Sequence, residues 1–523
     1  MTDLYFHDET SKTIIKASQT RISITTSDSS TGLIKSDTDG LQSTSLSRSL
    51  ESEALADSSV MIPQTILQSQ EEHALCFFFS EYILTSRHPE ASQGYLGYLE
   101  KFYTNAKRDS PITAATSAIA LAAFSAIPGK RELRLQARRQ YGEAVSRLKL
   151  AISDPVQARS DGTLISVLLF GLFESLTCNV QSLANWGKHN DGAVALVKAR
   201  GDSIFENPVS RQLFFVTRDQ TVLNHISRCE PIDLSPGATG AWIITSENLT
   251  DNAANRLVAL AVKLPSVRAA ALRIFGLPIN METAGEVLQL MNISKLIDEK
   301  FAAWEASVPE SWRYNTCASA FAGSRSDYPE KTEVYPGPAH CYYDIWVAST
   351  WNAYRTYRIF AQAIVLNCIE WLRPTTWGDA NTFQYYSTTR ILQQMVDDTC
   401  ASVPFHLGIS SSTAAEISFF VHSKKDFSIL LDKSDLFKRQ RGFHALGGYY
   451  LVWPLFVAAS VSCIPEIQKR WLRGRMTYIG ARYGLNQATA LAALGTHTAN
   501  WYYEEMMSVT DFTRQPKNRS SIL

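Results

Sequence analysis

The sequence lacks paired cysteines. Its 523 residues include 8 cysteines, but these are scattered singly, and no two form a Cys-x-x-Cys pair. A structural zinc site needs thiolates at short spacing, and a disulfide-stapled secreted domain is a small chain. The pattern therefore excludes both classes. We predict no metal site and expect reduced, buried thiols in an intracellular protein.

An excess of charge of either sign is also missing. Fifty Lys and Arg residues balance 50 Asp and Glu residues. Proteins that hold a polyanion such as DNA across a wide surface carry a basic excess. The balance disfavours that class for the chain as a whole.

Signal and membrane-spanning sequences are absent as well. The N-terminus, MTDLYFHDETSK, has neither the basic nor the apolar segment of a signal peptide. The longest apolar runs, 112–127 and 449–463, are too short or too interrupted to cross a bilayer. We expect no membrane attachment.

The common enzyme motifs do not occur. There is no GxGxxG following a strand, no P-loop, no HExxH and no GxSxG elbow. We predict that the protein is not an enzyme, with no catalytic residue and no cofactor.

Helical periodicity is what the sequence has in quantity. Residues 1–62 are rich in Ser, Thr and Asp, and such a segment cannot bury enough surface to offset its ordering entropy. We predict disordered tails at 1–62 and 511–523. Between them, over 63–510, apolar residues recur at helical spacing, and no stretch alternates for long with period two. This predicts an all-α fold, a large irregular multi-helix bundle, with one long helix over 339–371.

The clearest element is a helical hairpin over 161–201. Asp161 is a good N-cap, and residues 164–176 are apolar nearly all round, with Glu174 the one charge among them. The second arm ends at Gly201, a residue type suited to a helix C-terminus. That arm carries one helical stripe of Trp186, His189, Ala193 and Leu196.

Motifs spread over most of residues 70–500 resemble a known family. They are Tyr141-Gly142-Glu143-Ala144 with Leu148, Asp161, Thr163-Leu164, Phe173-Glu174, Trp186, His189, Gly192-Ala193, Arg200-Gly201, Trp304, Pro309, Trp312, Trp351-Asn352, Tyr354-Arg355, Arg358-Ile359, Val403-Pro404-Phe405, Gly447-Gly448-Tyr449, Trp453-Pro454-Leu455 and Ala458-Ala459. In order and spacing they resemble the fungal-specific transcription factor domain. This is the helical regulatory region that usually follows a Zn2Cys6 cluster in fungal regulators.

The resemblance implies a nuclear transcriptional regulator of a metabolic or secondary-metabolite gene set. Family members usually carry six cysteines near the N-terminus that hold two zinc ions against DNA, whereas this sequence has no cysteine before Cys76. We therefore expect no zinc cluster of its own and no DNA contact through one. The implied partners are a second copy or an intact zinc-cluster transcription factor, together with a small-molecule effector. Two alternatives stay open: a ligand-binding or dominant-negative partner of an intact zinc-cluster factor, and an uncharacterised enzyme.

Glu174 and His189 are the polar pair in the apolar hairpin. Acid–base or metal chemistry would need further partners at ligand spacing, and the sequence offers none. We predict that the two side chains tie helices together through buried hydrogen bonds. The enzyme alternative rests on this pair alone.

Trp351, Arg355 and Arg358 share one helical face and could grip an anionic ligand in a central cavity. We favour a core tryptophan with two arginines that anchor neighbouring carboxylates.

The strongest basic cluster aligns Arg131, Arg134 and Arg138, which could touch phosphates. A solvated helix face is the simpler interpretation. Lys424-Lys425 and the stretch 438–441 are candidate nuclear-import patches.

Overall fold

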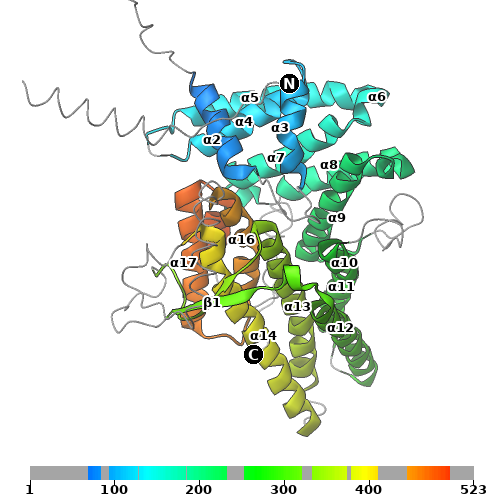
Figure 1. Ribbon diagram of the computed structural model, residues 1–523. Helices are drawn as coiled ribbons and strands as arrows, with labels where there is room; N and C mark the ends of the chain where they lie inside the picture. Colours follow the sequence, from blue (N-terminus) through cyan, green and yellow to red (C-terminus); the bar gives the residue numbers. More distant parts are fainter. Residues whose placement is uncertain are drawn as a thin grey trace, which may run out of the picture. The chain divides into compact units, whose positions relative to one another are not determined.

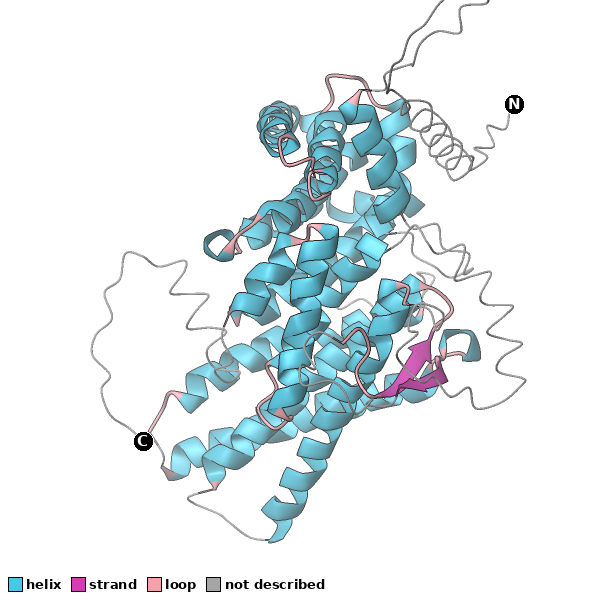
Figure 2. Ribbon diagram, turned by 90° about the vertical axis from the view of Figure 1, so that its left-hand side faces the viewer, coloured by secondary structure: helices cyan, strands magenta, loops and turns pink. Residues whose placement is uncertain are grey.

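The computed structural model describes residues 69–83, 94–127, 129–183, 185–232, 252–278, 280–320, 332–373, 379–409 and 444–494. Within these ranges the chain is almost wholly helical, with one two-stranded sheet (Figures 1 and 2). The prediction of an all-α fold is confirmed. The tails predicted at 1–62 and 511–523 lie outside the described residues, as do Lys424-Lys425 and the stretch 438–441.

Helices from the first part of the described chain surround α4 and α7. In order these elements are α2 (Gln70–Tyr82), α3 (Gly94–Asn105), α4 (Pro111–Phe124), α5 (Leu133–Ser153), α6 (Pro155–Ala158), α7 (Asp161–Thr177), η1 (Val180–Ser182), α8 (Asn185–Arg200), η2 (Gly201–Phe205) and α9 (Pro208–Arg228). Residues 163–173 of α7 are all buried, which explains why that stretch is apolar on every side. The alanine-rich α4 packs closely against α2, α5 and α7, because small side chains let helix backbones approach.

The N-cap of α7 is Ser160, whose side chain accepts from the backbone N–H of Thr163. Asp161 was predicted for this role and is instead the first helical residue. Its Oδ1 accepts hydrogen bonds from Arg200 Nη1 and Ser210 Oγ, each at 2.7 Å. Asp161 therefore joins the start of α7 to the end of α8 and the start of α9.

The later elements pack as long neighbouring helices around α13. They are α10 (Ala253–Ala261), α11 (Leu264–Phe275), α12 (Met281–Ser307), η4 (Glu310–Trp312), β1 (Asn315–Ala320), β2 (Gly337–Cys341), α13 (Ile345–Leu372), α14 (Asp379–Leu407), α16 (His444–Ala459), α17 (Glu466–Tyr483) and α18 (Asn486–Ala493). Helix α13 contacts α11, α12, α14 and α16 (Figure 1).

The small sheet corrects one sequence prediction. A single helix was predicted over 339–371, but residues 337–341 form β2, which pairs antiparallel with β1 from Asn315↔Cys341 to Ala320↔Gly337. Gly337 has φ +134°, and Pro338 follows it without a backbone N–H. Pairing with β1 holds residues 337–341 in an extended conformation, and the helix begins at Ile345, after Asp344, whose side chain accepts from the backbone N–H of Val347.

The cysteines follow the expectation of reduced, buried thiols only in part, because Cys76 is exposed and Cys229 and Cys463 are only partly buried. Free thiols occur at Cys76, Cys178, Cys229, Cys368, Cys400 and Cys463. Cys341, at the end of β2, is disulfide-bonded, so the expectation of reduced thiols is wrong there. Across the described ranges, no helix combines the length and the apolar character needed to span a bilayer.

Candidate functional site

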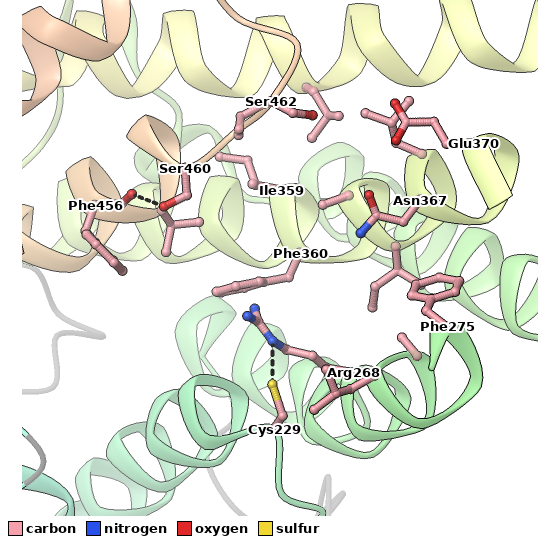
Figure 3. Close-up of a pocket in the computed structure, with 18 of the residues that line it drawn as sticks. Cys229, Arg268, Phe275, Ile359, Phe360, Asn367, Glu370, Phe456, Ser460 and Ser462 are labelled. Carbon is pink, nitrogen blue, oxygen red and sulfur yellow. Dashed lines mark hydrogen bonds between the residues drawn. The ribbon is translucent and has the colours of Figure 1, made fainter. Parts of the chain in front are cut away.

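A cavity of about 210 Å³ lies between α11, α13 and the C-terminal end of α16 (Figure 3). Its walls are mainly apolar and are formed by residues such as Phe275, Ile359, Phe360, Leu392, Phe456 and Val457. A cavity of roughly 150 Å³ is enough to hold benzene. This one therefore has room for a somewhat larger organic molecule.

Arg268, on α11, brings a positive charge to the apolar wall. Its Nε donates to Cys229 Sγ at 3.1 Å, and its guanidinium carbon lies 4.7 Å from the centroid of the Phe360 ring. Figure 3 shows the guanidinium between the thiol and that ring, at the edge of the open space. Cys229 ends α9 with φ 52°, a left-handed conformation that is rare outside glycine. The turn therefore helps to place the thiol beside Arg268.

Polar groups also come from the opposite side of the cavity. Asn367 and Glu370 extend from α13, while Ser460 and Ser462 follow α16 (Figure 3). Burial raises the pKa of the Glu370 carboxyl, and the charge of Arg373 lowers it in part. Ser460 Oγ donates to the Phe456 carbonyl at 2.8 Å. The site thus pairs an apolar interior with an arginine at one side and hydrogen-bonding groups at the other.

The structure brings Glu174 and His189 together and adds a third residue. Tyr141 Oη donates to Glu174 Oε1 at 3.1 Å and lies 3.1 Å from His189 Nε2. His189 Nε2 and Glu174 Oε1 lie 3.5 Å apart. The ring of Tyr141 stacks on Phe173 with 4.1 Å between centroids. These contacts join α5, α7 and α8, as the hydrogen-bonding interpretation of this pair requires.

Trp351 and Arg358 serve the packing around α12 and α13. Trp351 Nε1 donates to the Trp312 carbonyl at 2.7 Å. Arg358 makes a two-pronged ion pair with Asp298, with Nε to Oδ1 at 2.7 Å and Nη2 to Oδ2 at 2.8 Å. The interpretation of Arg358 as an anchor for a neighbouring carboxylate agrees with this geometry. Neither Trp351 nor Arg358 lines the cavity of Figure 3.

Arg355 has aromatic neighbours as well as the predicted carboxyl. Its guanidinium lies 5.1 Å from the Tyr314 ring centroid and 5.7 Å from that of Tyr342, and Nη1 donates to Asn352 Oδ1 at 2.7 Å. These contacts are with aromatic faces and an amide, while the predicted neighbouring carboxyl, that of Asp398, interacts with Arg355 through charge: burial raises the pKa of Asp398, and the charge of Arg355 lowers it in part. With only 1% of its surface exposed, Arg355 is enclosed by protein.

Two buried histidines near Arg355 should make the protein labile to acid. Burial lowers the pKa of His406 to about 4, and burial with the charge of Arg355 lowers that of His340 to about 3. Below about pH 6.5 the unfolded chain therefore binds protons that the native state does not. We expect the free energy of unfolding to fall between about pH 6.5 and pH 4, by on the order of 3 kcal/mol for His406.

Urea denaturation across this pH range measures the effect. His406→Gln should flatten the slope, whereas His73→Gln, at an exposed position on α2, should leave it unchanged. An identical slope in wild type and His406→Gln would contradict a neutral buried imidazole.

The predicted basic cluster lies at an exposed helix face. Arg131, Arg134 and Arg138 all have exposed side chains at or near the start of α5. This is the solvated face that the sequence favoured. The described residues contain no group of three or more His, Cys, Asp or Glu side chains placed to hold a metal ion.

The residues of the Figure 3 cavity were not predicted from the sequence. Arg268 and Cys229 are 39 positions apart and belong to no motif that we singled out. The only available signal was an arginine within the amphipathic segment that forms α11. A cavity arises where side chains of separate helices leave space, and single-helix periodicity does not report that.

Comparison with known proteins agrees with the resemblance in the sequence. Residues 78–225 match the model of the fungal specific transcription factor domain. The chain is also 22% identical over 422 residues to Transcription factor dbaG of Emericella nidulans, across 81% of this chain and 91% of that protein. No solved structure matches the chain. The family match runs from α2 into α9 and includes Tyr141, Glu174 and His189. Over residues 78–225 the chain is therefore similar to the fungal specific transcription factor domain, the family that its motifs also resemble.

Proposed function

We propose that this protein is a nuclear regulator of a metabolic or secondary-metabolite gene set, and that a small-molecule effector binds in the cavity of Figure 3. The observation that carries the effector site is a mainly apolar cavity of about 210 Å³ with Arg268 in its wall, in a chain similar to the fungal specific transcription factor domain. A protein of this kind acts by binding and not by catalysis.

The cavity chemistry favours a small organic acid or phenol as effector. An anionic group would meet the guanidinium of Arg268, and an apolar body would lie against Phe275, Phe360 and Phe456. Charge-assisted hydrogen bonds to arginine are stronger than those between neutral groups. Asn367 and Ser462, on the other side, would hydrogen-bond a second polar group.

Occupancy of the cavity would bias how three helices pack. Side chains of α11, α13 and α16 meet there, so a ligand contacts all three helices at once. A ligand shifts a conformational equilibrium only by its difference in affinity between the two states. We propose that the effector favours one packing of these helices and in that way changes the regulator's activity.

We propose that DNA is reached through a partner. The spacing of the cysteines supplies no zinc cluster within these 523 residues. Helix α5 and the short α6 present exposed apolar side chains suited to a protein contact, with Leu135 66%, Leu150 73% and Val156 80% exposed. A second copy or an intact zinc-cluster factor would fit this surface. In the second case the protein could also hold its partner inactive.

Chromatin association and transcript levels after gene deletion test the regulatory role. We expect the protein at a limited set of promoters and altered expression of the adjoining genes. Co-purification with a zinc-cluster factor, with target genes rising on deletion, would select the inhibitory alternative. A protein found at no promoter, whose deletion leaves expression unchanged, would count against the proposal.

Removing the charge of Arg268 tests the effector site. Arg268→Met keeps the length of the side chain but loses its hydrogen bonds, so we expect effector affinity to fall on the order of tenfold or more. Arg273→Met is the matched control, because Arg273 lies on the same helix with its side chain 61% exposed. Transcript levels of the target genes should change in the first variant and not in the second. Equal transcript levels in the two variants would exclude Arg268 from effector binding.

A further inference from the structure

A second cavity, of about 240 Å³, lies between α9 and α10 on one side and α13 and α16 on the other. Its walls are rich in aromatic rings, among them Trp186, Phe215, Trp346, Tyr357, Tyr450 and Trp453. Trp453 also lines the cavity of Figure 3, so one indole separates two neighbouring spaces. Among the described residues that line this second cavity there is no arginine, and the charged one is an acid, Asp219.

Asp219 is placed so that part of its carboxylate is enclosed and part is accessible. Its side chain is 43% exposed, yet Oδ1 is buried and accepts no hydrogen bond from the described residues. Because Asp219 lines the cavity, this accessible surface includes surface that faces the open space. The carboxylate is therefore available to a molecule inside.

The neighbouring cation, Arg218, compensates the negative charge of Asp219 only in part. Arg218 Nε lies 3.6 Å from Asp219 Oδ1, which is too long for a hydrogen bond. The guanidinium is directed toward α10 instead, since Nη2 donates to the Asn255 carbonyl at 3.2 Å, and it lies 5.0 Å from the Phe215 ring centroid. Burial raises the pKa of Asp219 to about 6, with the charge and hydrogen-bonding capacity of Arg218 opposing the shift.

Other titratable groups of the lining are tyrosines and are neutral at physiological pH. They are Tyr357 on α13 and Tyr449 and Tyr450 on α16. Burial raises the pKa of all three hydroxyls. The carboxylate thus faces a space whose remaining walls carry no formal charge.

Arg218 compensates the negative charge of Asp219 only in part, and a bound cation would add to that compensation through the accessible part of the side chain. Aromatic faces attract cations as well as planar apolar molecules. We propose that this cavity binds a small planar aromatic amine, with the protonated nitrogen held by Asp219 and the ring against Trp186, Trp346 or Trp453. This site is distinct from the effector cavity of Figure 3, whose wall holds an arginine, Arg268, as well as an acid, Glu370, and it does not depend on the proposed function.

Calorimetric titration of the purified full chain with three indoles of similar size tests the proposal. Tryptamine carries a protonated amine, 3-ethylindole is its neutral counterpart, and indole-3-acetate is an anion. At about pH 7.5, where Asp219 is ionised, we expect tryptamine to bind on the order of tenfold more tightly than 3-ethylindole. Indole-3-acetate should bind most weakly.

The same titrations on variants assign the preference to one carboxylate. Asp219→Asn keeps the shape of the side chain and should make the affinities for tryptamine and 3-ethylindole equal. Asp202→Asn, at an exposed position in η2, should keep the wild-type preference. Wild type itself should lose the preference for tryptamine over 3-ethylindole at about pH 5, where Asp219 is protonated. This measurement does not depend on the folding of a variant.

Three results would overturn the proposal: no binding of tryptamine to wild type, equal affinity of wild type for tryptamine and 3-ethylindole, or a preference that survives in Asp219→Asn. Each of these results would be measured on purified protein. A failure of this proposal can therefore be distinguished from a failure of the proposed regulatory role, which is tested at promoters.

Discussion

Replacing Asp298 by alanine is expected to lower the free energy of unfolding by about 3–5 kcal/mol, because it leaves a buried cation without its anion. Asp298 is 5% exposed and holds Arg358 through both carboxylate oxygens. Its Oδ2 also accepts from Gln362 Nε2 at 2.7 Å. Burial would lower the pKa of Arg358, but the hydrogen bonds and charge of Asp298 reverse this and raise it. An arginine side chain is effectively always protonated, so Arg358 stays charged in Asp298→Ala and keeps its desolvation cost without the compensating anion.

Urea denaturation of matched variants separates the ion pair from the loss of side-chain volume. Asp191→Ala removes one partner of Arg228, which also pairs with Glu230, in an ion pair whose side chains are 35% and 48% exposed, and should cost about 1 kcal/mol or less. The double variant Asp298→Leu with Arg358→Met should recover most of the loss, since an apolar pair of similar size can replace a buried ion pair. Equal losses for Asp298→Ala and Asp191→Ala would show that Arg358 is solvated.

The helical core could be predicted because burial leaves a direct mark on the sequence. Residues 164–176 are apolar all round, and in the structure α7 is enclosed by other helices. The start of that helix was misplaced by one residue, because Ser160 and Asp161 are both residue types that cap helices. Only tertiary contact with Arg200 and Ser210 distinguishes the two roles.

Polar pairs were predictable within one hairpin and not beyond it. Glu174 and His189 could be picked out from the sequence as the polar pair of one apolar hairpin. Tyr141, which joins them, comes from α5, 33 residues before the acid. The anion that pairs with Arg358 is likewise 60 residues away. Local periodicity predicts which side chains are buried, whereas their partners depend on how separate helices pack.

The two cavities lay beyond sequence analysis for the same reason. Asp219 follows Arg218 directly and reads as an ordinary charged pair on an amphipathic helix. The structure directs the arginine toward α10 and leaves the acid facing a space walled by α13 and α16. Neither orientation leaves a pattern in the sequence of α9.

A methyl group at Gly447 is expected to destabilise the protein by about 1–3 kcal/mol or more, because it overpacks a backbone contact. The Cβ of Gly447→Ala would meet the backbone carbonyl oxygen of His406 and lie 2.9 Å from its carbonyl carbon. Backbone at the end of α14 cannot rotate away as a side chain can, so α14 and α16 would have to separate. The glycine belongs to the Gly447-Gly448-Tyr449 motif, and this contact gives a physical reason for a glycine at that position.

The displacement of α14 in Gly447→Ala should also affect α13, because Asn352 on α13 contacts α14. Asn352 Nδ2 lies 3.5 Å from His406 Nε2 and donates to Ser402 Oγ at 2.9 Å. Thermal unfolding of Gly447→Ala measures the loss. Gly142→Ala is the matched control, because a Cβ at this exposed α5 position meets nothing within 4 Å. It should gain roughly 0.5–1 kcal/mol from the lower entropy of its unfolded chain. If Gly447→Ala and Gly142→Ala had the same melting temperature, α14 and α16 would not approach so closely. The glycine at position 447 would then need another explanation.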